Sequence, residues 1–465
     1  MLPENLPVSP SDSPSRRRHA VGRAVFGLAV TALAGFALTG CGRNGVDSAP
    51  FAPAPGVERG VVGIERARTD AILGFELVIR LRPGVNRLAL FQEYGVDPQE
   101  VLSDGLTWRV TVRAGVSAAG ILTAAREDER IELVEQNIST SIPESAQSSV
   151  AFSEGIVPPE DFWDQTVARR LDLAQAHSVT NGAPIIVAVL DTGINREHPL
   201  FKGHLLADGY DFIDHDGDTA DLPDGVDNDN DGLTDEAAGH GCHVAGLVLF
   251  VAPGARILPV RVLNSGGTGT AYAVARGIES AVDRGARVIN MSLTMATSSA
   301  VVFNAIAYAT SKNVIMVCAA GNDGGANPLS YPANDGRVWA VGALDAQNNL
   351  AAFSAPSSGV VLAAPGEHLL SAYWDGGYAS WSGTSMSAPL VAGTAALVLA
   401  QYRWTPPAGV LAMLQTSAVP IVAGGVTNPY GVGAGLVARG SAVGAFAAGP
   451  GILQGNTEIK VVSRR

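Results

Sequence analysis

Continuous apolar runs alternate with helical stretches through the second half of this chain. The runs span residues 185–190, 288–291 and 314–319. Uninterrupted apolar strands of this kind are typical of a parallel sheet that is buried on both faces. Between them, residues 272–284 and 301–311 have helical patterns. The alternation predicts a doubly wound α/β domain over residues 165–448, with a mostly parallel sheet and helices on both faces.

The acidic character of the chain is confined to one segment. Of the 465 residues, enough for two or three domains, 47% are hydrophobic and 16% are charged. This composition excludes a disordered chain and predicts no nucleic-acid partner. The formal net charge is -13, yet 12 acidic residues lie between Asp208 and Glu236, and residues 203–255 contain no lysine or arginine. The acidity therefore indicates a local site and not a field that steers distant ligands.

Residues 1–40 have the pattern of an export signal. A basic start at Arg16–Arg18 precedes the apolar run 25–38, which is too short to cross a bilayer comfortably. The run ends in Leu-Thr-Gly-Cys, which resembles the lipobox of bacterial lipoproteins and implies cleavage before Cys41 and a lipid on its sulfur. An ordinary secretory signal with an incidental cysteine is the alternative. We expect an exported protein, lipid-anchored to the membrane of the bacterial cell envelope or secreted after later cleavage, with no other transmembrane segment.

Residues 41–70 have the composition of a tether, and residues 71–138 form a small unit of their own. The expected strands are 75–81, 106–112 and 131–135, and the expected helices are 86–94 and 117–127. This split βαβ order is typical of a ferredoxin-like α+β domain. Residues 139–164 are a linker and cleavage region, expected to be unstructured over 139–160. Residues 449–465 form a tail.

A turn of small residues, Gly383–Pro389, precedes the apolar run 390–400. That run has the length and composition of a buried helix. Ser385 would stand at or near the helix N-terminus, where unpaired N–H groups and the helix dipole favour negative charge. A serine there can act as a nucleophile, because the oxyanion formed by its attack is stabilised on the spot. It can equally be a helix N-cap, so this segment alone leaves both interpretations open.

Three further polar residues end apolar strands or open a helix. Asp191 and Asn322 each follow such a strand closely, and His240 opens the segment His-Gly-Cys-His-Val-Ala-Gly. Hydrolysis by a serine needs a base, a buried carboxylate that orients the base, and a donor that binds the oxyanion. His240, Asp191 and Asn322 supply one of each. Together they favour the nucleophile interpretation of Ser385.

These segments resemble the motifs of the subtilisin-like serine peptidases, the subtilase family. The matching segments are Asp191-Thr192-Gly193, His240-Gly241-Cys242-His243, Ala319-Ala320-Gly321-Asn322 and Gly383-Thr384-Ser385-Met386. The resemblance covers about residues 165–448 and implies a serine endopeptidase without an organic cofactor. It implies that Asp191 orients the general base His240 and that Ser385 attacks the substrate. Asn322 and the backbone N–H of Ser385 would then bind the oxyanion.

The same resemblance implies which surfaces hold a peptide or protein substrate. The two edges that sandwich an extended peptide are Ser265, Gly266 and Gly267 on one side and Ser292, Leu293 and Thr294 on the other. One wall of the pocket for the residue before the scissile bond is formed by Ala319, Ala320 and Gly321. The family usually has glycine where this chain has Thr294, so we expect a narrowed pocket. Without the catalytic residues, these segments would be ordinary strand edges and turns.

By position and pattern, the unit at 71–138 resembles the inhibitory propeptide that often precedes these peptidases. Its last strand would lead the chain into the active site, so that the propeptide acts as an intramolecular inhibitor. We expect self-cleavage around residues 138–150. With a lipid on Cys41, this cleavage would leave the anchor on the propeptide and release the catalytic domain.

The acidic segment contains a candidate calcium loop. Asp227, Asp229 and Asp231 match the opening of an EF-hand loop, but position 238 is alanine where a glutamate would close it. Asp235 and Glu236 come early instead. Oxygen ligands suit a hard cation, and related peptidases commonly use structural calcium. We predict one or more structural Ca²⁺ ions held by these five acids, with a solvated acidic loop as the alternative.

Two other functions fit the sequence. A non-catalytic surface-binding module could use the same fold, although every catalytic position is filled. The second is a narrow processing peptidase or a transpeptidase, because Thr294 departs from the family pattern. The cysteines after the signal, Cys242 and Cys318, lie in apolar segments, and we expect both to be free thiols.

Overall fold

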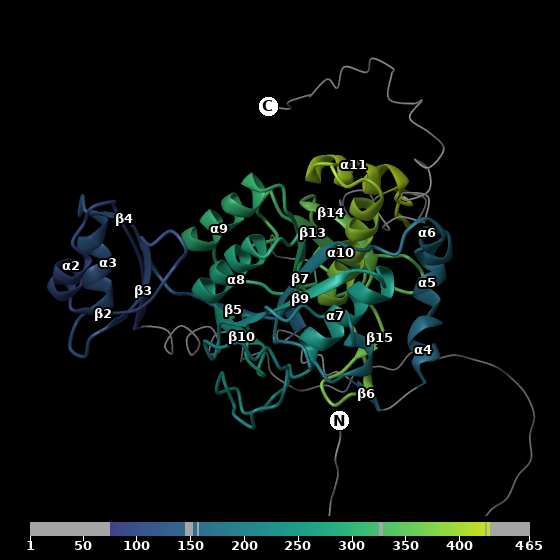
Figure 1. The fold of residues 1–465 in the computed structure, drawn as a ribbon, viewed down its shortest axis with the longest axis horizontal. Coiled ribbons are helices and arrows are strands. Elements are labelled where there is room, and N and C mark those ends of the chain that lie inside the picture. The colour runs from purple at the N-terminus through teal and green to yellow at the C-terminus, as the bar shows by residue number, and fades with distance from the viewer. Residues whose placement is uncertain (1–74, 145–151, 156–157, 325–328, 424–425, 428–465) are drawn as a thin grey trace, which may run out of the picture. The chain divides into compact units, whose positions relative to one another are not determined.

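The computed structural model describes residues 75–144, 152–155, 158–324, 329–423 and 426–427 (Figure 1). The chain divides into two units, Met1–Glu58 and Arg59–Arg465. The first unit, which contains the expected signal and Cys41, lies outside the described residues, and so does the expected tail at 449–465. Every described element belongs to the second unit.

Residues 76–136 fold into a four-stranded antiparallel sheet with two helices. In chain order the elements are β1 (Glu76–Leu81), α2 (Arg87–Tyr94), β2 (Val96–Val101), β3 (Thr107–Val112), α3 (Ala118–Arg126) and β4 (Ile131–Gln136). The strand order β2-β3-β1-β4 is that of a ferredoxin-like fold. Alternate residues of β1 serve different cores: Leu77 and Ile79 pack with Phe91 of α2, whereas Val78 belongs to the core of the larger domain.

Strand β2 is absent from the sequence-based prediction. Its segment contains Pro98, and a proline within a short run counts against a strand. Among the described strands β2 is an edge strand that pairs with β3 alone, and its register shifts between Pro98 and Glu100. An edge strand tolerates proline, because the missing N–H need not serve a second neighbour.

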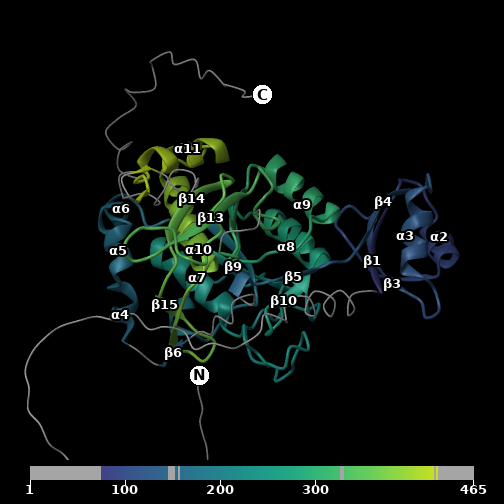
Figure 2. The ribbon, with the colours of Figure 1, turned by 180° about the vertical axis from the view of Figure 1, so that it is seen from behind.

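A seven-stranded parallel sheet forms the centre of the larger domain, which confirms the predicted doubly wound α/β fold. Its spatial order is β14 (Val360–Pro365), β13 (Trp339–Leu344), β12 (Ile315–Ala319), β11 (Val288–Met291), β7 (Ile186–Asp191), β9 (Arg256–Arg261) and β8 (Tyr210–Asp211). Helices α7 (His240–Val251) and α10 (Thr384–Gln401) pack on one face. Helices α8 (Ala271–Asp283) and α9 (Ala300–Ser311) pack on the other (Figures 1 and 2).

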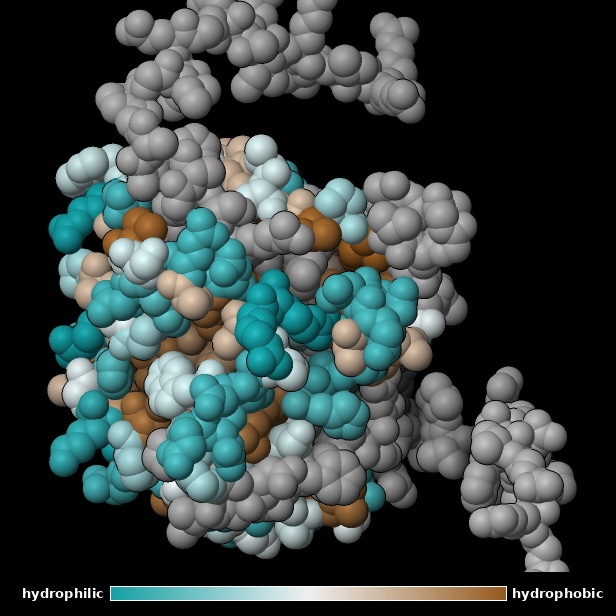
Figure 3. Space-filling view, turned by 90° about the vertical axis from the view of Figure 1, so that its right-hand side faces the viewer, coloured by the Kyte–Doolittle hydropathy of each residue, from teal (hydrophilic) through white to brown (hydrophobic). Residues whose placement is uncertain are grey.

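Shorter elements complete the described fold. They are β5 (Ser139–Ser141), β6 (Phe152–Gly155), α4 (Pro159–Trp163), α5 (Thr166–Arg170), α6 (Leu173–Val179), η2 (Pro199–Phe201), β10 (Thr268–Thr270), β15 (Leu369–Ala372), β16 (Tyr378–Trp381), α11 (Pro407–Ser417), β17 (Val422–Ala423) and β18 (Val426–Thr427). On the side that carries α4–α6, the described surface is mostly hydrophilic, and hydrophobic residues show mainly in recesses (Figure 3).

The expectation that residues 139–160 are unstructured is wrong for the parts of this segment that the structure describes, residues 139–144, 152–155 and 158–160. Strand β5 pairs antiparallel with β10, β6 pairs antiparallel with β16, and α4 begins at Pro159. The partners of β5 and β6 lie more than a hundred residues further along the chain. Because these strands gain their hydrogen bonds from distant edges, the serine- and proline-rich composition of the segment does not reveal them.

Two side chains at the end of β4 hold the N-termini of α8 and α9. The carboxylate of Glu135 accepts hydrogen bonds from the backbone N–H groups of Ala300 at 2.7 Å and Val301 at 2.9 Å. Asn137 Oδ1 accepts one from the backbone N–H of Tyr272 at 3.0 Å. These contacts pair N–H groups that a helix start leaves free, and Glu135 places negative charge at the positive end of the dipole.

Helix α10 is the central helix of the larger domain. It is the one helix of the described segments that is long and apolar enough to cross a membrane by composition, and 89% of that stretch is buried inside the protein. Burial of this extent is that of a core helix. Both Cys242 and Cys318 are buried free thiols, as expected.

Candidate active site

The four candidate catalytic residues meet at the carboxyl edge of the parallel sheet. Asp191 is the last residue of β7, His240 the first of α7 and Ser385 the second of α10, and Asn322 comes three residues after β12. None of the four is more than 2% exposed. Adjacent parallel strands end at the same edge, so residues that are distant in the chain come together there.

Asp191 and His240 are joined by a short contact. Asp191 Oδ1 lies 2.6 Å from His240 Nδ1 and also accepts a hydrogen bond from the backbone N–H of Thr192 at 2.8 Å. The hydroxyl of Thr192 in turn accepts one from the backbone N–H of Gly241 at 2.9 Å. A Cβ at Gly241 would clash with the backbone of Gly193, so the close approach of α7 to the end of β7 requires glycine.

A buried acid outside the predicted set holds the start of α7. The two carboxylate oxygens of Asp221 accept hydrogen bonds from the backbone N–H groups of Gly239 at 3.0 Å and Cys242 at 3.1 Å. Gly239 is the N-cap and has no side chain to do this itself. Burial raises the pKa of Asp221 to about 6, although the two hydrogen bonds oppose the rise. Asp221 lies 19 residues before His240 among many other acids, so no sequence pattern marks it.

His240 and the nearby His243 have different surroundings. The ring of Trp381 contacts His240 edge-on, with centroids 5.3 Å apart. His243 Nε2 lies 2.9 Å from the carbonyl oxygen of Leu369 and 3.1 Å from that of Ala379. Burial lowers the pKa of His243 to about 3, so its imidazole is neutral and donates to these carbonyls. His243 therefore ties α7 to the strands behind it.

Two N–H donors converge at the start of α10. Asn322 Oδ1 accepts hydrogen bonds from the backbone N–H of Thr384 at 3.0 Å and from its hydroxyl at 2.9 Å, so Nδ2 is the donor side of this amide. The backbone N–H of Ser385 is one of the groups that the helix start leaves unpaired. Asn322 Nδ2 and Ser385 N lie 3.0 Å and 3.4 Å from the same oxygen, Glu144 Oε1.

Glu144 is the residue that the sequence did not mark as part of the site. It is 1% exposed, and its second oxygen, Oε2, accepts a hydrogen bond from the Ser385 hydroxyl at 2.7 Å. The same oxygen lies 3.4 Å from His240 Nε2. Within the described part of the chain His240 Nε2 has no well-aligned hydrogen bond, so the carboxylate stands between the serine and the imidazole. A Cβ at Gly383 would clash with this carboxylate.

The charge state of His240 follows from its two carboxylate neighbours. Burial lowers the pKa of His240, but the charge and hydrogen bond of Asp191, and then Glu144, outweigh burial and raise the pKa to about 10. The imidazole is therefore protonated at neutral pH in this arrangement.

The chain's own segment lies between two edges of the larger domain. Ser141 and Thr294 exchange two backbone hydrogen bonds, of 3.0 Å and 2.8 Å. On the other side β5 pairs with β10, with Thr140 opposite Gly269, and the N–H of Ile142 donates to the carbonyl of Gly267 at 3.0 Å. Residues 139–142 thus occupy the position of an added strand.

The edge that pairs with residues 139–142 coincides only in part with one of the two predicted substrate edges. Of the predicted residues Ser265, Gly266 and Gly267, Gly267 is hydrogen-bonded to the segment through its backbone carbonyl, and the paired edge continues through β10. Ser265 Oγ and the backbone N–H of Gly266 instead donate to Asn228 Oδ1, at 3.0 Å and 3.2 Å. Gly267 has a positive φ of 73°, and this turn redirects the chain so that the residues after it form the edge.

The other predicted edge also supports the serine. The Ser292 hydroxyl donates to the backbone carbonyl of Ser385 at 2.9 Å. In a regular helix this carbonyl would accept from residue 389, but Pro389 has no N–H, and Ser292 supplies the donor instead. Leu293 is fully buried in the core, so among the three predicted residues Thr294 carries the backbone pairing.

The predicted pocket wall lies directly behind these groups. Ala319, the last residue of β12, and Ala320 are fully buried, and the backbone N–H of Gly321 donates to the hydroxyl of Thr384 at 3.2 Å. Gly321 has a φ of 104°, which favours glycine. The wall is therefore tied to the start of α10.

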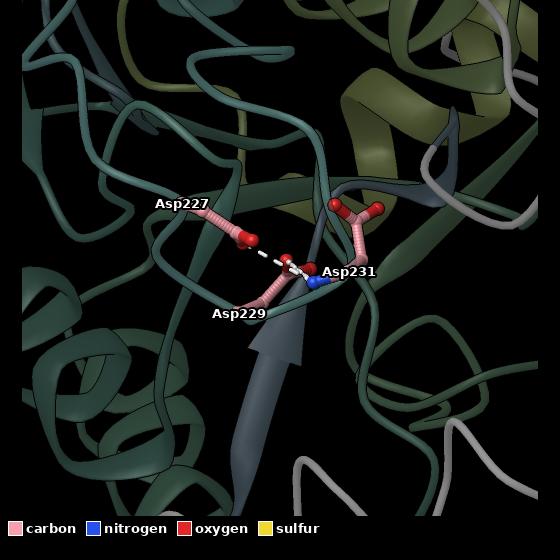
Figure 4. Close-up of side chains that lie close together, drawn as sticks. All are labelled: Asp227, Asp229 and Asp231. Atoms are coloured by element: carbon pink, nitrogen blue, oxygen red, sulfur yellow. Dashed lines mark hydrogen bonds between the residues drawn. The ribbon is translucent and has the colours of Figure 1, made fainter.

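The structure brings three of the five predicted metal ligands together. Asp227, Asp229 and Asp231 each offer an oxygen within 4.8 Å of the others. Figure 4 shows the carboxylates of Asp227 and Asp229 directed at the backbone N–H of Asp231, to which their oxygens lie at 3.1 Å and 3.3 Å. Three clustered carboxylates fit a hard cation, although calcium takes six to eight oxygen ligands, so further carbonyl or water oxygens would be needed.

The other two predicted ligands differ in position. Asp235 accepts hydrogen bonds from the backbone N–H groups of Asp224 at 2.7 Å and Gly225 at 2.9 Å, so it stabilises the loop. Glu236 is outside the cluster of three, but burial, and then the charges of the three aspartates, raise its pKa. The spacing of these acids in the sequence did not distinguish a metal ligand from a residue that stabilises the loop.

Comparisons with known proteins agree with this geometry. The model of the subtilase family matches residues 182–433. Thermitase from Thermoactinomyces vulgaris is 38% identical over 245 residues, which cover 50% of this chain and 82% of thermitase. Subtilisin Savinase from Lederbergia lenta is 36% identical over 282 residues, 58% of this chain and 96% of Savinase. Fervidolysin from Fervidobacterium pennivorans, a keratinolytic enzyme related to subtilisin, shares the fold, with a TM-score of 0.64 and 24% identity over 80% of this chain and 61% of its own.

Proposed function

The chain belongs to the subtilase family and is a subtilisin-like serine endopeptidase, and we propose that its catalytic triad is Asp191, His240 and Ser385. Asn322 and the backbone N–H of Ser385 form the oxyanion hole. The observation that carries this assignment is the 2.6 Å contact between Asp191 and His240 next to two N–H donors that converge at Ser385. A non-catalytic binding module would need neither the Asp191–His240 contact nor the two converging donors.

In the proposed reaction the Ser385 hydroxyl attacks the carbonyl carbon of the scissile bond while His240 Nε2 takes its proton. The oxyanion is received by the two donors that hold Glu144 Oε1 in the structure. His240 then gives its proton to the leaving amine, and a water molecule hydrolyses the acyl-enzyme with the same base. Asp191 keeps the imidazole oriented and stabilises its charged form.

Substrates are peptides or proteins that bind as an added strand. Residues 139–142 support this mode, because they pair with Gly267 and β10 on one side and Thr294 on the other. The β-branched Thr294 narrows the cleft at the point where its hydroxyl lies 3.4 Å from the carbonyl of Ser141. This supports restricted substrate choice.

The N-terminal domain acts as an intramolecular inhibitor that self-cleavage around residues 138–150 removes. Its support is the contact of β5 with the substrate edges and of Glu135 with α9. Export, a lipid on Cys41 and release of the catalytic domain from that anchor belong to the same proposal. Structural Ca²⁺ at Asp227, Asp229 and Asp231 rests on their clustering.

Expression of the full chain with and without Ser385→Ala tests the triad and the self-cleavage. Mass spectrometry of the products and hydrolysis of fluorescent casein are the measurements, and Ser311→Ala, at an exposed serine, is the control. We expect cleavage at 138–150 and casein hydrolysis in the parent and the control only. Identical intact chains without activity in all three would refute the assignment.

A further inference from the structure

The carboxylate of Glu144 engages every polar group that the proposed reaction uses at the scissile bond. One oxygen lies 3.0 Å from Asn322 Nδ2 and 3.4 Å from the backbone N–H of Ser385. The other lies 2.7 Å from the Ser385 hydroxyl and 3.4 Å from His240 Nε2. The side chain is 1% exposed, so water does not screen these contacts.

Each contact blocks one step of hydrolysis. The nearest acceptor of the Ser385 proton is Glu144, while the carbonyl oxygen of Ser292 is 3.5 Å away, so the proton is not directed at the base. The two oxyanion donors are occupied by a negative oxygen. His240 lies between two carboxylates, those of Asp191 and Glu144, and a protonated imidazole cannot accept the serine proton.

We propose that the Glu144 side chain is a built-in product mimic, whose carboxylate occupies the oxyanion hole and holds the uncleaved chain inactive. The inference rests on the proposed triad and names the group that regulates it. It differs from blockage by the backbone of β5, because the contacts with the catalytic atoms come from a side chain. Activation then requires this one carboxylate to leave before any carbonyl can enter the oxyanion hole.

The position of Glu144 follows from the pairing of β5. The pairing of Ser141 with Thr294 and the Ile142–Gly267 hydrogen bond bring the chain along the cleft. Pro143 and Glu144 then begin a helical turn, and both are buried. The Glu144 side chain reaches the catalytic atoms, in the space that a substrate carbonyl would fill.

The inhibition by Glu144 depends on the charges of Glu144 and His240, so the loss of either charge should release the active site. The titratable group that faces Glu144 is His240 on α7, with Asp191 on β7 behind it; Asn322 and Ser385 on the remaining sides are neutral donors. Replacing the Glu144 carboxylate by an amide removes its pull on the His240 proton, and deprotonating His240 removes the cation that holds Glu144. The inhibitory contact is therefore an ion pair between Glu144 and His240, supported by three hydrogen bonds from Asn322 and Ser385 to Glu144.

The first test compares self-cleavage of the full-length parent, Glu144→Gln, Glu144→Asp and the exposed control Glu160→Gln. Glutamine removes the charge at equal size, and aspartate keeps the charge but is one methylene shorter. Because hydrogen bonds to charged groups are lost in both, we expect self-cleavage to be about 10- to 100-fold faster in both variants and unchanged in the control. Rates in both equal to the parent would overturn the proposal.

The second test does not depend on activity. In the Ser385→Ala background, proton NMR follows the low-field signal of the His240 Nδ1–H shared with Asp191 as the pH is raised. Glu144→Gln should lower the pH at which the imidazolium signal is lost by at least about one pH unit, because one of two carboxylates is removed. An unchanged midpoint would overturn the role of Glu144.

The two proposals fail in different ways. If the parent and both Glu144 variants hydrolyse casein no faster than Ser385→Ala, the proposed triad is wrong, while the NMR midpoint still reports on Glu144. If the parent is active but the Glu144 substitutions change neither the self-cleavage rate nor the His240 midpoint, the triad stands and the product-mimic proposal is wrong.

Discussion

Asp221→Asn tests how a buried charge at the start of α7 affects stability. The pKa of Asp221 is about 6 in the folded chain, above its ordinary value of 3.8, chiefly because of burial. The folded state therefore holds this proton more tightly than the unfolded state. The resulting stabilisation is fully present below about pH 3.8 and is lost as the pH rises through 6. The gap between 3.8 and about 6, at about 1.36 kcal/mol per pKa unit, makes this contribution about 3 kcal/mol.

Asparagine does not titrate, so this pH dependence disappears in the variant. Asn also cannot accept from both Gly239 and Cys242, which costs about 1–3 kcal/mol at every pH. We expect the free energy of unfolding of the parent, minus that of Asp221→Asn, to fall by about 2.4 kcal/mol between pH 4 and pH 7.5, because part of the contribution is already lost at pH 4.

Denaturant titrations followed by tryptophan fluorescence measure this difference, with Ser385→Ala in both chains to prevent self-cleavage. Asp161→Asn, at an exposed aspartate of α4, is the matched control and should show no such trend. A difference between parent and Asp221→Asn that is constant with pH would refute the reasoning.

Other substitutions test single contacts of the site. Asn322→Ala should lower kcat for peptide hydrolysis by about 10²–10³, the range known for an oxyanion donor in this family, with little change in KM; an unchanged kcat would remove Asn322 from the oxyanion hole. Ser292→Ala leaves the Ser385 carbonyl without its hydroxyl donor, since Pro389 has no N–H, and should cost about 1–3 kcal/mol in the free energy of unfolding, with no loss counting against this contact. EDTA should lower the melting temperature and Ca²⁺ should restore it, less so in Asp229→Asn; a melting temperature insensitive to chelation would contradict the calcium site.

The sequence by itself determined the fold class and which residues could do the chemistry. Uninterrupted apolar strands can be buried on both faces only in a sheet covered by helices, and such strands place the residues after them at one edge. Asp191 ends a strand, Asn322 follows one, and His240 and Ser385 lie at the starts of helices, so the local pattern sufficed to single them out. The ferredoxin-like order was likewise recognisable, although β2 was hidden by Pro98.

Only the tertiary structure decided what surrounds those residues. Glu144 reaches the serine because β5 pairs with an edge some 130 residues away, and Asp221 serves α7 because its loop folds back on the helix start. The same holds for the edge that pairs with residues 139–142, which runs from Gly267 into β10, and for the separation of Asp235 from the acidic cluster. Backbone pairing and helix capping between distant segments depend on where a chain passes in space, and neither residue type nor spacing records that path.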